Sequence, residues 1–139
     1  MFLAKFYDLI WNENLGDTPL LTEFISSSSG ALVDLGCATG RVLRLAKQLN
    51  RRAIGIDQYP TMLELANEKL SKINVGTFRL INDDFCKLRL DEPFELVTCV
   101  ANTFTMIVDS SKRLSLIKLI YERLPSRGKF LIWFMNDTG

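Results

Sequence analysis

The spacing of apolar residues changes along the chain. At the N-terminus they recur at helical spacing, at Phe2, Leu3, Phe6, Ile10 and Trp11, and this predicts a helix. A second helix is expected with Thr18 as its N-cap and Pro19 as its first residue, until serines 26–29 and Gly30 interrupt it. From residue 31 onward, short continuous apolar runs alternate with amphipathic segments. The runs predict strands at 32–35, 53–56, 77–81, 96–100 and 129–135, and the segments predict helices at 39–49, 61–70 and 111–124.

This alternation predicts an α/β fold. Continuous apolar strands separated by helices form a mainly parallel sheet, here of about five strands, with helices on both faces. Right-handed crossovers place ligands at the carboxyl ends of such strands. Gly36, Asp57, Asp84 and Asn102 all fall at those ends. A binding site is therefore expected at this edge of the sheet.

Length, composition and charge limit the possible partners. The chain has 139 residues, 47% of them hydrophobic, which suits one domain with a real core. We expect residues 1–30 to form an N-terminal helical segment and residues 31–139 the core of that domain. Charges of both signs are interspersed and the net charge is +1, so we expect neither a nucleic-acid nor a membrane partner. The N-terminus lacks the features of a signal peptide, and we expect a cytoplasmic protein.

The cysteines and histidines exclude two kinds of site. Cys37, Cys86 and Cys99 show no C-x-x-C spacing, and the chain has no histidine. A zinc site and a Cys–His nucleophilic pair are therefore excluded, and no metal is expected. The cysteines lie in or beside apolar runs, which favours small buried hydrophobes in a reducing compartment.

The most informative segment is V-D-L-G-C-A-T-G-R at residues 33–41, where an apolar strand turns into a helix. Glycines at Gly36 and Gly40 allow a tight turn and a close approach of a ligand to the backbone. The amides at a helix N-terminus attract negative charge. The spacing differs from the dinucleotide pattern G-x-G-x-x-G, and the lysine of the phosphate-binding loop G-x-x-x-x-G-K-[ST] is missing. The glycine spacing of this loop therefore disfavours a nicotinamide oxidoreductase.

The segment instead resembles motif I of the class I S-adenosylmethionine (AdoMet) dependent methyltransferases, D/E-x-G-x-G-x-G, with Ala38 in place of the middle glycine. Three further segments carry the resemblance in the family's order. These are A-I-G-I-D ending at Asp57, N-D-D-F at 82–85, and F-E-L-V-T-C-V-A-N at 94–102. The resemblance covers residues 32–102 and implies a Rossmann-like fold that binds AdoMet.

The resemblance also implies roles for individual residues. The loop would pass under the amino-acid end of AdoMet, Asp57 would accept hydrogen bonds from the ribose hydroxyls, and Asp84 with Phe85 would hold the adenine. Tyr7, in a Y-D-L-I sequence similar to the N-terminal segment of small-molecule methyltransferases, would reach the pocket. The expected cofactor-binding residues are Tyr7, Asp34, Gly36, Cys37, Ala38, Thr39, Gly40, Asp57, Gln58, Met62, Asp84, Phe85, Ala101 and Asn102.

Several of these residues also have a purely structural interpretation. Asp34 could cap the loop, and Thr39 could cap the helix that follows it. Met62 could be helix core rather than a cover for adenine. Asp84 could cap the short segment after it and competes with Asp83 for the adenine role.

The expected function is methyl transfer to a small-molecule acceptor, which requires alignment of the reactants and exclusion of water. Catalytic residues are not identified, and the candidates for a general base are Tyr7, Asp109 and Glu13. The sequence A-N-T-F at 101–104 lacks the [D/N]-P-P-[Y/F] pattern of methyltransferases that act on base amino groups. The alternative is a non-catalytic AdoMet-binding module, or a subunit that completes or regulates another methyltransferase.

Class I methyltransferases normally add a helix and an antiparallel hairpin after the strand that corresponds to 129–135. The sequence stops at Gly139, so this strand is expected to be an edge. It reads K-F-L-I-W-F-M and carries almost none of the charges that protect natural edge strands. We therefore expect Phe130, Ile132, Trp133 and Phe134 to be partly exposed, and a homodimer to cover this edge.

Overall fold

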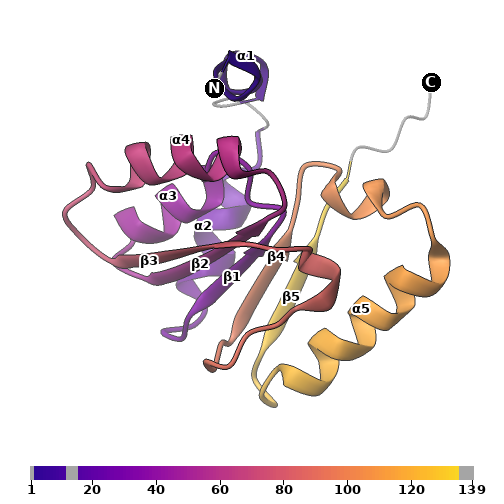
Figure 1. The fold of residues 1–139 in the computed structure, drawn as a ribbon. Helices are drawn as coiled ribbons and strands as arrows, with labels where there is room; N and C mark the ends of the chain where they lie inside the picture. Colours follow the sequence, from indigo (N-terminus) through magenta and orange to yellow (C-terminus); the bar gives the residue numbers. More distant parts are fainter. Residues whose placement is uncertain (1, 12–15, 135–139) are drawn as a thin grey trace.

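The computed structural model describes residues 2–11 and 16–134, which form a five-stranded parallel sheet with helices on both faces (Figure 1). The strands are β1 (Leu32–Leu35), β2 (Arg52–Asp57), β3 (Thr77–Asn82), β4 (Leu96–Cys99) and β5 (Lys129–Ile132). They lie in the order β3-β2-β1-β4-β5, and every neighbouring pair is parallel. Strands β2 and β3 lie on one side of β1, and the later strands β4 and β5 lie on its other side. The predicted α/β architecture is confirmed, and a crevice is expected where this order reverses, between the carboxyl ends of β1 and β4.

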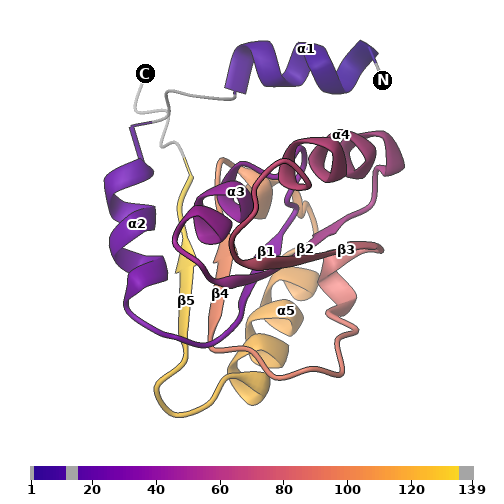
Figure 2. The same cartoon turned by 90° about the vertical axis from the view of Figure 1, so that its left-hand side faces the viewer.

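The helices are distributed unevenly around the sheet. They are α1 (Phe2–Trp11), α2 (Thr18–Ser26), α3 (Arg41–Gln48), α4 (Pro60–Leu70) and α5 (Ser110–Arg123), with short 3-10 helices η1 (Phe85–Lys87) and η2 (Thr103–Met106). Helices α2, α3 and α4 cover one face, and α5 covers the other (Figures 1 and 2). Helix α1 lies outside these layers, above α4 (Figure 2). No helix of the described residues is long and apolar enough to cross a membrane.

Strand register explains the two apolar layers. Leu32 is paired with Ala53 on β2 and with Leu96 on β4, and all three belong to the core cluster on the α3 side. The next residue, Val33, is paired with Ile54 and Val97, which belong to the cluster on the α5 side. Because side chains alternate along a strand, a sheet covered on both faces needs continuous apolar strands. This is the pattern from which the fold was predicted.

The ends of some elements differ from the sequence prediction. Strand β5 ends at Ile132 rather than at residue 135, and Met135 lies outside the described residues. Just past this end, the indole Nε1 of Trp133 donates to Asp17 Oδ2 at 2.9 Å. Phe130, Ile132 and Trp133 are partly buried and Phe134 is 51% exposed, so the expected partial exposure is confirmed.

The predicted N-cap of the second helix, Thr18, was wrong, and the alternative interpretation of Thr39 as an N-cap does not hold either. Helix α2 is preceded by Asp17, and Thr18 is its first residue. Helix α3 begins at Arg41, and Gly40 is its N-cap with φ +86°, in the left-handed region. The Thr39 hydroxyl donates instead to Asp8 Oδ1 on α1, a tertiary contact that local sequence cannot show.

Candidate functional site

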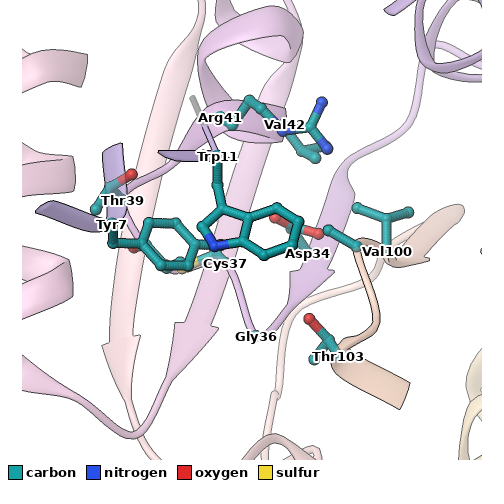
Figure 3. Close-up of a pocket in the computed structure, with 12 residues that line it drawn as sticks. Tyr7, Trp11, Asp34, Gly36, Cys37, Thr39, Arg41, Val42, Val100 and Thr103 are labelled. Carbon is teal, nitrogen blue, oxygen red and sulfur yellow. The ribbon is translucent and has the colours of Figure 1, made fainter. Parts of the chain in front are cut away.

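A pocket opens at the carboxyl end of the sheet, between the loop after β1 and the loop after β4 (Figure 3). The pocket is a shallow hollow that is open to solvent, with a cavity volume of about 30 Å³. Its walls come from α1, from the two loops and from the start of α3. The lining residues are Tyr7, Trp11, Asp34, Gly36, Cys37, Ala38, Thr39, Arg41, Val42, Val100, Ala101 and Thr103.

Hydrogen bonds to β2 fix the loop after β1. The amides of Gly36 and Cys37 both donate to the carbonyl of Ile56, at 2.8 and 3.1 Å, and the amide of Ala38 donates to Asp57 Oδ2 at 2.9 Å. Gly36 has φ +70°, and Ala38 has φ +46°, a left-handed conformation that is unfavourable for a residue with a Cβ. The hydrogen bonds to β2 offset this strain and fix the loop as one wall of the pocket.

Asp34 lies at the base of the pocket and is 3% exposed. Its Oδ1 accepts a hydrogen bond of 2.7 Å from the Thr98 hydroxyl on β4. Burial raises the pKa of the Asp34 carboxyl to about 7, although Thr98 and Arg41 act in the opposite direction. A positively charged group entering the pocket would favour the ionised carboxylate. Asp34 therefore offers a ready partner for a ligand ammonium.

Asp57 ends β2 and is buried. Its Oδ2 accepts from Ala38 and its Oδ1 accepts from the amide of Tyr59, both at 2.9 Å. Asp57 thus joins the motif I loop to the start of α4. Each carboxylate oxygen can accept a second hydrogen bond, which leaves capacity for the predicted ribose contact. Next to it, Gln58 is exposed and Met62 is half-buried on α4.

Asp84 and Phe85 follow β3. Asp84 is the N-cap of η1, and its Oδ1 accepts from the Cys86 amide at 3.0 Å, so the structural interpretation of this residue holds. Phe85 is half-buried against the cluster on the α5 side. The neighbouring Asp83 pairs with Arg89 on the surface, and this hydrogen bond lowers the pKa of the Asp83 carboxyl. The predicted adenine contacts of Asp84 and Phe85 stay predictions.

The loop after β4 forms the opposite wall. Ala101 and Asn102 have φ +56° and +68°, so two consecutive residues other than glycine adopt the left-handed conformation. Such strain is concentrated at binding and active sites. Ala101 lines the pocket together with Val100 and Thr103, whereas Asn102 is the N-cap of η2.

Helix α1 closes the pocket from above. Asp8 accepts hydrogen bonds from the Thr39 hydroxyl and, at 2.8 Å, from Lys69 Nζ on α4, which ties α1 to the loop and to α4. Tyr7 and Trp11 project from the same helix toward the loop and Asp34 (Figure 3). Burial raises the pKa of the Tyr7 hydroxyl, so this group stays protonated at neutral pH.

Sequence reasoning missed five lining residues. They are Trp11, Arg41, Val42, Val100 and Thr103. A signal was available for Arg41 and Val42, because they directly follow Gly40 in the first turn of α3, where amides point at a ligand. Of the predicted cofactor-binding residues, seven line the pocket: Tyr7, Asp34, Gly36, Cys37, Ala38, Thr39 and Ala101. The other seven lie beyond its lining: Gly40, Asp57, Gln58, Met62, Asp84, Phe85 and Asn102.

The candidates for a general base are only partly located. Asp109 is the exposed N-cap of α5, where it accepts from the amide and hydroxyl of Ser111, and these bonds lower the pKa of its carboxyl. It is not among the residues that line the pocket. Glu13 lies outside the described residues. Tyr7 is the candidate that reaches the pocket.

The donor set of the pocket fits the zwitterionic amino-acid end of AdoMet. The buried carboxylate of Asp34 suits its ammonium, and the first-turn amides of α3 suit its carboxylate. The pocket lies at the reversal point of the sheet, where ligands of open α/β folds bind. No group of three or more histidine, cysteine, aspartate or glutamate side chains in residues 2–11 and 16–134 could hold a metal ion.

Comparison with known proteins gives matches to methyltransferases. Residues 32–128 match the model of a methyltransferase domain family. Among curated proteins, the chain is similar to a carboxy-S-adenosyl-L-methionine synthase of Nautilia profundicola, with 34% identity over 88% of this chain and 51% of that protein. It is also similar to a cypemycin N-terminal methyltransferase of a Streptomyces species, with 25% identity over 88% of this chain and 50% of that protein. The chain thus spans about half the length of these relatives.

A solved structure shows the same fold. The chain superposes on a methyltransferase from Clostridium acetobutylicum that depends on S-adenosylmethionine, with a TM-score of 0.78 and 20% identity. The match covers 94% of this chain and 55% of that structure. Since the family match covers all but the first and last segments of the chain, and motif I borders the pocket, this chain belongs to the class I AdoMet-dependent methyltransferases.

Proposed function

We propose that this chain transfers the methyl group of AdoMet to a small-molecule acceptor bound beneath α1. The observation that carries the proposal is the position of the pocket, which lies between motif I and the strained loop after β4 and is covered by Tyr7 and Trp11. We also propose that residues 1–139 form one AdoMet-binding domain, with an N-terminal helical segment at 1–30 whose helix α1 covers the site formed by residues 31–139.

The chain's own residues would hold the two reactants in line. Bound AdoMet supplies a methyl group on a sulfonium that is already a good leaving group. Asp34 would hold the ammonium of the cofactor, and Asp57 would accept its ribose hydroxyls. Asp84 and Phe85 would border its adenine. Helix α1 would exclude water from the reacting atoms, and most of the rate would come from alignment.

The titratable groups of the pocket favour one class of acceptor. Among the lining residues that the structure describes, these groups are Tyr7, Asp34, Cys37 and Arg41. Asp34, with a pKa of about 7, would be occupied by the ammonium of AdoMet. Burial raises the pKa of both the Tyr7 hydroxyl and the Cys37 thiol, so neither loses its own proton readily at neutral pH to act as a base. We therefore propose an acceptor that is nucleophilic without the help of a base, such as an unprotonated amine or a carboxylate.

A second candidate is a non-catalytic AdoMet-binding module, or a subunit that completes another methyltransferase. In that case the acceptor site would come from another polypeptide, and the pocket described here would only bind AdoMet.

Two experiments test these proposals in sequence. AdoMet and S-adenosylhomocysteine should raise the melting temperature in a concentration-dependent way, while NAD and ATP should not. Stabilisation by NAD alone would reject AdoMet binding. Incubation with AdoMet labelled on the methyl group and a metabolite pool then separates the enzyme from the binding module, because only the enzyme yields a labelled product.

We also propose that the protein is a cytoplasmic homodimer. All three cysteines are free, which suits a reducing compartment. Strand β5 is an edge strand, and Phe134 just beyond it is 51% exposed, so a second copy would cover apolar surface. Light scattering at micromolar concentration should give twice the mass of the chain. A non-aggregating monomer whose β5 amides exchange slowly would reject the dimer.

A further inference from the structure

Helix α1 has two different faces. Ala4, Tyr7, Asp8 and Trp11, spaced as one face of a helix, are turned toward the body of the protein and are buried or half-buried. Leu3, Phe6, Leu9 and Ile10 are on the other side and are 75%, 52%, 83% and 56% exposed. The indole of Trp11 on the inner face does not end in the apolar core. It forms part of the wall of the pocket (Figure 3).

Asp8 anchors the helix that carries this indole. Its bonds to the Thr39 hydroxyl and to Lys69 Nζ fix the middle of α1 against the motif I loop and α4. Trp11 is three residues further along, about one helical turn. The ring thereby lies in the wall of the pocket that Gly36 and Thr103 also line.

The charges around this space favour a cation. Asp34 presents a carboxylate at the base of the pocket, and both Asp34 and Asp57 act electrostatically on Tyr7 beside Trp11. Arg41 acts on Tyr7 and Asp34 in the opposite direction, but a two-point ion pair with Asp17 offsets part of its charge. Asp8 adds a third carboxylate near Tyr7. An aromatic face opposite a carboxylate, in a partly desolvated site, is the arrangement that binds a positively charged group.

We infer that Trp11 recognises the sulfonium of AdoMet through the face of its indole ring, and that this contact lets the pocket distinguish AdoMet from S-adenosylhomocysteine. The two molecules differ by one methyl group and one positive charge on sulfur. A cation–π contact acts only on the charged form, whereas hydrophobic packing acts on both. The inference rests on the proposed function, because it requires that AdoMet binds in this pocket.

Titration calorimetry of three variants with both ligands tests the inference. In Trp11→Leu, the Kd for AdoMet should rise about 3- to 30-fold, and the Kd for S-adenosylhomocysteine should change less than about 2-fold. Trp11→Phe keeps an aromatic face and should retain most of the preference for AdoMet. Phe6→Leu removes a ring from the outer face of the same helix and is the matched control, with both affinities unchanged.

The outcomes separate the inference from the proposed function. If the wild-type protein binds neither ligand, the proposed function fails. If it binds both and Trp11→Leu weakens both equally, Trp11 is only a hydrophobic cover and the inference is wrong. Should Trp11→Leu not fold, tryptophan analogues with increasing ring fluorination replace it. Affinity for AdoMet alone should then fall stepwise, since fluorine weakens the negative face of the ring, and an unchanged affinity would overturn the inference.

Discussion

The guanidinium of Arg41 donates two hydrogen bonds to the carboxylate of Asp17, at 2.6 Å to Oδ1 and 2.8 Å to Oδ2. The Trp133 indole donates to the same carboxylate. This group of three side chains connects the start of α2, the first turn of α3 and the segment after β5. It also explains why Asp17, although it precedes α2, makes no side-chain cap bond with that helix.

Replacing Asp17 should therefore destabilise the protein strongly. The side chains of Arg41 and Asp17 are only 18% and 7% exposed, so Asp17→Ala leaves a largely buried guanidinium without its partner. We expect a loss of about 3 kcal/mol in the free energy of unfolding, measured by urea denaturation. The control is Glu68→Ala, which removes the exposed pair with Lys72 and should cost less than about 0.5 kcal/mol. Equal losses in the two variants would contradict the prediction.

The carboxyl of Asp34 should make stability depend on pH. Its pKa is about 7 in the folded state and 3.8 in a model compound. Between these values the folded protein keeps a proton that the unfolded chain has released, so stability falls as pH rises through this window and is level above it.

Asp34→Asn provides the comparison, because the amide cannot ionise and its oxygen can still accept from Thr98. The melting temperature of the wild-type protein relative to this variant should decrease from about pH 4 to about pH 7. If the melting temperatures of the two proteins instead change equally with pH across that range, Asp34 is ionised throughout and the prediction is wrong.

Asp57 should matter for both binding and folding. Asp57→Ala should weaken AdoMet binding by about 1–3 kcal/mol, the range for hydrogen bonds to a charged group. It should also lower stability, because the amides of Ala38 and Tyr59 lose their acceptor. From sequence alone, little loss of fold would be expected for this change.

Calorimetry and denaturation together test both effects. Glu68→Ala is again the control, since this residue pairs with Lys72 on the surface and is not among the lining or predicted binding residues, so it should leave AdoMet affinity unchanged. A folded Asp57→Ala variant with wild-type affinity would mean that the ribose lies elsewhere.

Gly36 should tolerate no side chain. A Cβ at this position would lie 2.3 Å from Cγ2 of Thr103, in a backbone with φ +70°. We expect Gly36→Ala to cost about 2–4 kcal/mol, from the left-handed backbone and from the collision. Gly16 has the same φ, and a Cβ there would meet no atom of the described part of the chain within 4 Å, so Gly16→Ala isolates the backbone cost, about 1 kcal/mol.

A double variant checks the assigned cause. Thr103→Ser removes the colliding methyl group, so it should restore part of the stability of Gly36→Ala in denaturant unfolding. No recovery would mean that Thr103 is not what Gly36 avoids.

Much of the fold and part of the site could be predicted from the sequence. Apolar runs at most of the strand positions predicted a sheet covered on both faces, because a strand that is buried on both sides has few polar positions. The motif at 33–41 located one wall of the pocket, since glycine spacing and the step from strand to helix are local properties of the chain.

Only the tertiary structure decided which distant side chains meet. Thr39 has the chemistry of an N-cap, yet its hydroxyl bonds Asp8 on a helix 31 positions away in sequence. Asp17 was not recognised from sequence, because its partners Arg41 and Trp133 are 24 and 116 positions away. A polar side chain takes the partner that folding brings within reach, and local sequence does not contain that information. The sequence alone determined the sheet and the motif I loop, and the packing of α1 and α2 decided what covers and surrounds the pocket.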